Sequence, residues 1–137
     1  MKRHADLLLL AGRVLVALTP LVMGVHHARN LAGTAAFLKD ALRVPGAGVT
    51  LAAAFAGFEV AAGLALLVGW RTRAAAVALA VFTGALALLA HLRPALAVAD
   101  PVIRDAEYYQ VLRGFAAAGA LLVLAATGPG RHALEPR

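Results

Sequence analysis

The sequence contains no cysteine among its 137 residues. The chain therefore forms no disulfide, no CxxC redox pair, no thiolate nucleophile and no cysteine-ligated zinc or iron–sulfur cluster. Any redox role depends on a bound cofactor, a quinone or a partner subunit. The sequence also shows no Ser-His-Asp set, carboxylate pair or phosphate loop. We expect no catalytic residue and no metal site, and the chain is not expected to be an enzyme on its own.

Charged residues are scarce as well, at 15% of the chain, whereas 62% of the residues are hydrophobic. So few polar side chains do not cover the surface of a water-soluble core, and the hydrophobic content excludes a disordered chain. This composition is typical of a membrane protein, and the length supports one domain. The net charge of +6 would suggest nucleic acid for a soluble protein. In a membrane protein basic residues set the orientation instead, so we expect a lipid bilayer and no nucleic acid as partner.

Four apolar stretches have about the 20 residues that a helix needs to cross a bilayer core. They cover residues 7–25, 50–69, 74–90 and 111–127. Because lipid offers no partners to unpaired backbone groups, they predict an all-α, antiparallel four-helix bundle over residues 1–137. In the first long loop, Thr34 is expected to cap a short interfacial helix that runs to Arg43. In the second, Asp100 and Pro101 predict the start of a helix that continues into the fourth span.

The basic residues near the span ends predict the orientation. The clearest signal is the short turn Arg71-Thr72-Arg73, which contains no acid. The residues expected on that side are Lys2, Arg3, Arg71, Arg73, Arg131 and Arg137. We therefore expect a multi-pass protein of the bacterial inner membrane with both termini in the cytoplasm. The N-terminal stretch is expected to be a retained helix, because Arg13 interrupts its apolar run and no signal-peptide cleavage site follows.

Ionisable side chains within the spans each need a physical reason, because they are costly at mid-membrane. At 1.5 Å per residue from the cytoplasmic ends, Glu59 lies roughly 15 Å deep, between Arg13 at roughly 9 Å and Arg113 at roughly 21 Å. Two interpretations remain open. Glu59 forms a structural ion pair with one arginine, or it forms a polar pocket with an arginine that holds a quinone head group, an anion or a proton.

Three histidines, His26, His27 and His91, come out close to the outer ends of the first and third spans. His26 or His27 together with His91 would suit two axial haem ligands or part of a metal site. Plain interfacial histidines, satisfied by water and lipid headgroups, are the preferred interpretation. The segments His27-Ala28-Arg29 and His91-Leu92-Arg93 also resemble each other, which either a duplicated helical hairpin or chance explains.

These residues also carry a resemblance. The motif is Arg13 early in the first span, Gly24 before His26-His27, and above all Phe58-Glu59-x-x-x-Gly63-Leu64-x-Leu66-Leu67-x-Gly69-Trp70-Arg71-Thr72-Arg73-Ala74-Ala75, with His91 and Thr127-Gly128-Pro129-Gly130-Arg131 further on. In these features the sequence resembles the DoxX family of small bacterial four-helix membrane proteins. A lysine often follows the helix-one glycine in that family, whereas here His26, His27 and Arg29 follow it.

The resemblance implies a four-helix inner-membrane protein with cytoplasmic termini. Relatives have been linked to thiosulfate oxidation that feeds quinone, and to complexes with a superoxide dismutase and a sulfurtransferase. The leading hypothesis is an accessory subunit or anchor of a redox, oxidative-stress or sulfur-oxidation system that contacts quinone, as a homo- or hetero-oligomer. The alternative is a small transporter or a lipid- or metabolite-binding membrane protein. The ligand-binding candidates are Glu59, Arg13, Arg113, His91, His26 and His27.

Overall fold

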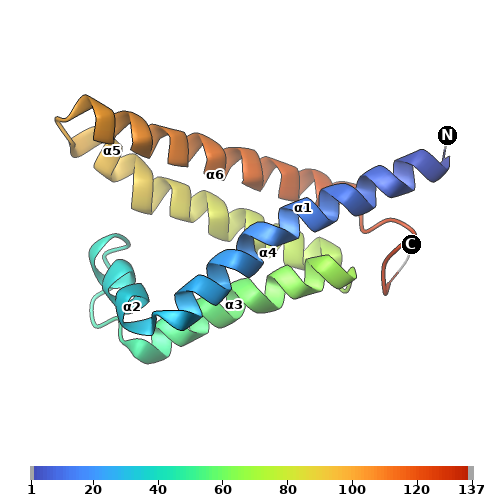
Figure 1. Ribbon diagram of the computed structural model, residues 1–137, viewed down its shortest axis with the longest axis horizontal. Helices are drawn as coiled ribbons and strands as arrows, with labels where there is room; N and C mark the ends of the chain where they lie inside the picture. Colours follow the sequence, from blue (N-terminus) through green and yellow to red (C-terminus); the bar gives the residue numbers. More distant parts are fainter. Residues whose placement is uncertain (1, 136–137) are drawn as a thin grey trace.

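The four apolar stretches form four long helices, and a short helix lies in the first connection between them (Figure 1). The computed structural model describes residues 2–135, so Met1, Pro136 and Arg137, the last of which entered the orientation argument, lie outside it. The elements are α1 (Lys2–Arg29), α2 (Leu31–Asp40), α3 (Val49–Val68), α4 (Thr72–Leu86), η1 (Ala87–Leu92), α5 (Arg93–Ala97) and α6 (Pro101–Thr127). Within the described range all elements are helical, which confirms the predicted all-α membrane bundle.

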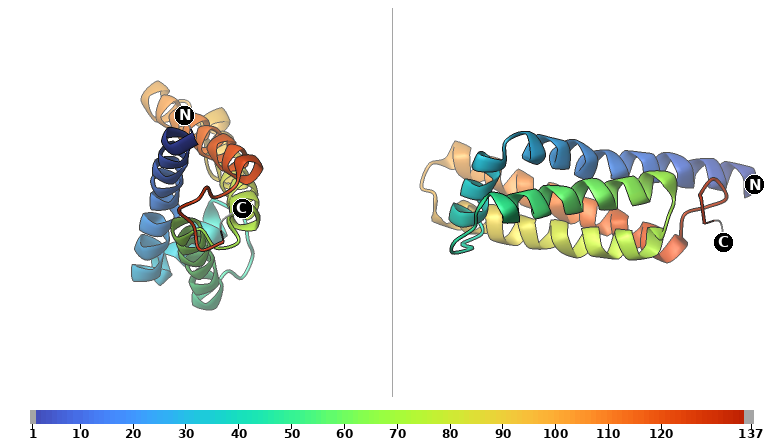
Figure 2. Two further views of the ribbon diagram at one scale, coloured as in Figure 1. Left: turned by 90° about the vertical axis from the view of Figure 1, so that its right-hand side faces the viewer. Right: turned by 90° about the horizontal axis from the view of Figure 1, so that it is seen from below.

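Three of the four spanning helices are longer than the apolar stretches inside them, whereas α3 has the same length as its stretch. The third spanning helix runs without a break from Thr72 to Ala97, through α4, η1 and α5. As predicted, Asp100 begins α6, because its Oδ1 accepts hydrogen bonds from the backbone N–H groups of Val102 at 2.8 Å and Ile103 at 3.3 Å. Helix α1 extends well beyond its neighbours toward the N-terminus (Figure 2).

The bundle consists of two packed helix pairs, α1 with α3 and α4 with α6, joined by contacts between α3 and α4. Between them lies a core of alanine and leucine side chains: Ala17, Ala62, Leu66, Ala76, Leu79, Ala80, Leu121 and Leu124. Residues 2 and 135 lie near the same end of the bundle, which we call the terminal end (Figure 1). The opposite end, with α2 and α5, is called the loop end.

The first connection differs from the prediction in where its helix begins and ends. Helix α2 spans Leu31–Asp40 instead of Thr34 to Arg43, and its N-cap is Asn30, whose side chain accepts from the Gly33 N–H at 3.0 Å. Thr34 is buried inside the helix, where its hydroxyl donates to the carbonyls of His27 at 3.1 Å and Asn30 at 3.0 Å. The proposed Thr34 cap was therefore wrong, because this hydroxyl already has backbone acceptors one turn earlier.

Helices α1 and α3 approach each other closely at Gly24. A Cβ at this position would lie 2.8 Å from the Cγ2 of Val60 and 2.9 Å from the Cβ of Glu59. It would also lie 2.9 Å from the backbone nitrogen of Val60, which no side-chain movement relieves. Glycine is thus required here for contact between the two helices, as is common where helices pack closely in lipid.

We predict that Gly24→Ala destabilises the protein by about 1–3 kcal/mol, the usual penalty for overpacking. Gly12→Ala is the matched control in the same helix, because nothing lies within 4 Å of its added Cβ. That change should leave the stability equal or raise it by up to about 1 kcal/mol through helix propensity. Thermal unfolding in detergent measures both, and equal midpoints for the two variants would contradict the close approach.

Candidate functional site

Glu59 lies halfway along α3 and is buried, with only 5% of its side chain exposed. Its Oε2 lies 2.6 Å from Nδ1 of His27 on α1, whose side chain is 15% exposed. Two of the predicted candidates therefore meet. The expected partners of Glu59, Arg13 or Arg113, do not contact it: within residues 2–135 its salt bridge is to His27.

The predicted ion pair between Glu59 and Arg13 was wrong because the depths of the two residues in the membrane were counted from helix ends that do not lie at the same level. Arg13 lies level with the end of α3, since its Nη1 is 2.7 Å from where a Cβ of Gly69 would be. From there, eleven residues lead to Gly24, about 16 Å along α1, and ten lead back to Glu59, about 15 Å along α3. Gly24 and Glu59 therefore share a level, and His27 follows less than one turn further on.

Aromatic rings pack against the imidazole of His27. The ring of Phe37 on α2 stacks with it at a centroid distance of 6.3 Å, and that of Phe55 on α3 meets it edge-on at 5.3 Å. Phe55 in turn contacts Phe82 on α4 at 5.0 Å. His26, the neighbouring candidate, is exposed and meets the His27 ring at 5.9 Å. The aromatic neighbours could not be assigned from sequence spacing, because they come from three different helices.

Arg13 is almost fully buried, with 2% exposure, and binds backbone carbonyls instead of an acid. Its Nη1 donates to the carbonyl of Pro129 at 2.8 Å, and its Nη2 donates to the carbonyl of His132. Both acceptors belong to the segment 128–135, which we call the strap. The strap crosses the terminal end of the bundle after α6. Arg13 is therefore an anchor for the strap and lies apart from Glu59.

Arg113 is exposed on the surface of α6, where its guanidinium donates to the side-chain oxygen of Gln110. Its placement also departs from the predicted pairing with Glu59. Helix α6 packs mainly on α4, and Arg113 is exposed instead of buried against α3. Because Arg113 is twelve residues from the start of α6, about 18 Å along the helix, it lies near mid-span on an outward face.

His91 forms a second histidine–glutamate pair, in which its Nδ1 lies 2.8 Å from Oε2 of Glu107 on α6. This pair is more open than the first, with side chains 32% and 27% exposed. His91 lies in η1, a π-helical segment just before Pro94, which lacks the N–H that a regular helix needs. The sequence analysis missed Glu107. The sequence does contain a signal for it. His91 and Glu107 are separated by similar numbers of residues from the connection just before Asp100, so they are expected at the same level on two adjacent helices.

We predict that Arg13→Met frees the strap. Loss of two hydrogen bonds from a buried cation should raise the rate of tryptic cleavage after the exposed Arg131 by about tenfold or more. Arg113→Met, which removes an exposed arginine from another span, is the matched control and should leave that rate unchanged. The measurement is limited proteolysis in detergent micelles with mass spectrometry of the fragments. Equal rates in the two variants would contradict the anchoring role.

Comparison with known proteins adds one finding. The family model of DoxX matches residues 8–92, a stretch that runs from α1 through η1 and includes Arg13, His27, Glu59 and His91. Neither curated proteins nor solved structures gave a match. Since the matched stretch covers more than half of the chain, the protein belongs to the DoxX family.

Proposed function

We propose that this DoxX-family membrane protein is an accessory subunit of a membrane redox system and that it binds a quinone head group at the His27–Glu59 pair. The observation that carries the proposal is the 2.6 Å contact between His27 Nδ1 and Glu59 Oε2 inside an apolar helix bundle. The basic turn at Arg71 and Arg73 supports an orientation with the terminal end in the cytoplasm of a bacterial inner membrane. The proposed quinone site then lies toward the opposite face.

The His27–Glu59 pair can form a hydrogen bond with either redox form of a quinone, because the gain or loss of one proton changes His27 between donor and acceptor. With Nδ1 directed at Glu59, the Nε2 atom of His27 has no hydrogen-bond partner among the described residues. A neutral imidazole accepts a hydrogen bond at Nε2 from a quinol hydroxyl. An imidazolium, stabilised by the Glu59 carboxylate, donates from Nε2 to a quinone carbonyl instead. The chain supplies no electrons, so the redox step itself belongs to a partner.

The surroundings of the pair also support a flat aromatic ligand. The rings of Phe37 and Phe55 form a cluster with the imidazole, and the two phenylalanine centroids lie 6.4 Å from each other. Ligand sites of this kind combine an apolar, aromatic lining with a few placed polar groups. His27 is the more exposed member of the pair, so an incoming head group meets the imidazole before the carboxylate.

Arg113 supports the accessory role. A guanidinium exposed near mid-span costs at least about 2.5–3.5 kcal/mol in lipid on insertion scales. The Gln110 side chain does not neutralise its charge. A carboxylate on a transmembrane helix of a partner subunit would do so, and it would also place that partner beside α6.

The transporter alternative is supported less well by the geometry. It requires a water-filled cavity that reaches Glu59, but this side chain is 95% buried and one of its oxygens is held by His27. A cavity of about 520 Å³ does occur, at the terminal end of the bundle and away from Glu59. No contact of Glu59 favours transport over binding.

We predict that the purified protein binds ubiquinone-1 and that His27→Phe weakens this binding by about tenfold or more, because the hydrogen bond to the head group is lost. Glu59→Gln keeps an acceptor for His27 but removes the charge, so it should weaken binding while the protein remains folded. Isothermal titration calorimetry in detergent micelles measures the affinity. The folded state of each variant is checked by size-exclusion chromatography and thermal unfolding.

The second histidine–glutamate pair provides matched controls. His91→Phe and Glu107→Gln make the same chemical changes at the more exposed pair and should leave the quinone affinity unchanged. Absence of saturable binding by the wild type would contradict the proposal. So would binding that no substitution weakens, which would indicate partition of the quinone into the micelle, and equal losses from the two histidine variants, which would show that the effect is not specific to His27. If Glu59→Gln unfolds the protein while His27→Phe binds normally, Glu59 is only structural.

A further inference from the structure

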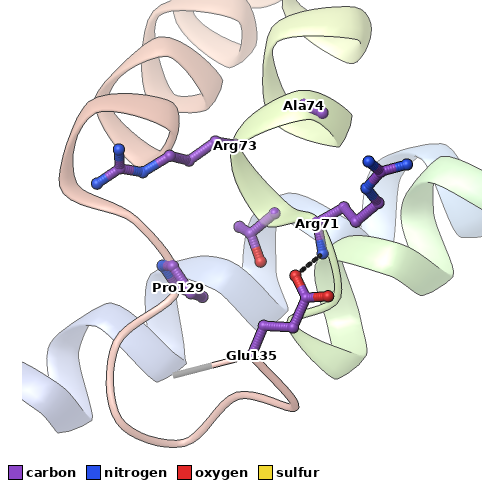
Figure 3. Close-up of a pocket in the computed structure, with 6 residues that line it drawn as sticks. Arg71, Arg73, Ala74, Pro129 and Glu135 are labelled. Carbon is purple, nitrogen blue, oxygen red and sulfur yellow. Dashed lines mark hydrogen bonds between the residues drawn. The ribbon is translucent and has the colours of Figure 1, made fainter. Parts of the chain in front are cut away.

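The cavity at the terminal end lies where α4 begins under the strap (Figure 3). Its volume of about 520 Å³ falls within the range of small-molecule sites, about 300–1,000 Å³. The lining residues are Arg71, Thr72, Arg73, Ala74, Pro129 and Glu135. None of them takes part in the proposed quinone site, so the cavity needs an explanation of its own.

The first turn of α4 presents unsatisfied donors to this cavity. No side chain caps the helix, and within the described part of the chain the N–H groups of Thr72, Arg73 and Ala74 have no hydrogen-bond acceptor. The start of a helix also carries the positive end of its dipole. Such a helix start favours an anion.

Thr72 provides an independent indication of a ligand. The residue is 3% exposed, and its Oγ1 is buried without a hydrogen-bond partner in residues 2–135. An unsatisfied buried hydroxyl costs about 1–3 kcal/mol, so native proteins rarely keep one without a reason. Since Thr72 lines the cavity, an oxygen atom of a bound ligand would satisfy this hydroxyl.

A carboxylate already occupies part of the cavity. Oε2 of Glu135 accepts a hydrogen bond from the backbone N–H of Arg71 at 3.0 Å (Figure 3). The strap holds Glu135 there through two backbone bonds, from Leu134 N–H to the Val68 carbonyl at 3.1 Å and from Glu135 N–H to the Gly69 carbonyl at 3.3 Å. Because the Glu135 side chain is on the surface, it can leave without unfolding the bundle.

We propose that this cavity binds a phosphate group and that Glu135 acts as its internal competitor. The Arg71 N–H, the Thr72 hydroxyl and the free N–H groups of α4 donate to phosphate oxygens. The side chains of Arg71 and Arg73, which extend to different sides of the turn in Figure 3, neutralise the charge. The phosphate comes either from an anionic lipid headgroup or from a free small molecule. Trp70, which is 51% exposed directly before the turn, places this end at headgroup level.

The test uses Trp70, the single tryptophan of the chain, as a fluorescent reporter of the full-length protein. In one arm, inorganic phosphate is titrated into protein in a neutral detergent at constant ionic strength, with chloride as the reference anion. In the other arm, the protein is placed in phosphatidylcholine nanodiscs with increasing phosphatidic acid. The variants are Thr72→Val, Arg73→Gln and Glu135→Gln, with Arg93→Gln at the loop end as the charge-matched control.

We expect saturable binding in at least one arm, and that arm identifies the source of the phosphate. Thr72→Val and Arg73→Gln should each weaken binding by about tenfold or more, since each removes a hydrogen bond to a charged group. Glu135→Gln should strengthen it, because a competing negative charge is removed, and this surface change leaves the fold intact. The proposal fails if neither arm saturates, if Arg93→Gln weakens binding as much as Arg73→Gln, or if Glu135→Gln weakens it.

Discussion

The close packing of α1 on α3 at Gly24 is the constraint on which the rest of the structure depends. A carboxylate in the middle of an apolar helix must find a partner, and Glu59 finds His27 only because no Cβ separates the two helices. The same packing sets the level of α1 along the bundle. It brings Arg13 to the end of α3, where the guanidinium anchors the strap that covers the start of α4. Both proposed sites therefore follow from one helix contact.

The fold could be predicted from the sequence because an apolar stretch of about 20 residues matches the thickness of the bilayer core and therefore indicates a spanning helix. The hydrogen-bonding partners of the buried charged side chains could not be predicted from the sequence. A helix is often longer than its apolar part, so the first apolar residue of α1 is a poor reference for depth, and Arg13 was placed too deep. Nor does a sequence pattern show that an arginine is satisfied by main-chain carbonyls, as Arg13 is by those of Pro129 and His132. Glu59 and His27 were both recognised as candidates, but their pairing required the packing.

The two halves of the chain are built alike, which gives the repeated His-x-Arg segments a structural counterpart. In each half an outgoing helix carries a histidine near its loop end, and the returning helix supplies the glutamate that pairs with it. The halves differ in burial. His27–Glu59 lies among aromatic rings with side chains 15% and 5% exposed, whereas His91–Glu107 is 32% and 27% exposed. A hydrogen bond strengthens as water is excluded, and this difference in burial is the reason why we propose the first pair, and not the second, as the ligand site.

The two proposed sites call for opposite chemistry and lie at opposite ends of the bundle. The loop end offers an imidazole that changes its hydrogen-bonding role with one proton, and the terminal end offers fixed donors and guanidinium groups for an anion. The core between them consists of alanine and leucine side chains, which transmit no proton. Helices α1 and α3 both carry residues close to each site, with His27 and Glu59 at the first site and Arg13 and Gly69 beside the second. Any coupling between the sites must therefore be mechanical, through a shift of this helix pair. The close contact at Gly24 is where such a shift would meet steric resistance, because backbone and side-chain atoms of α3 leave no room there for a Cβ.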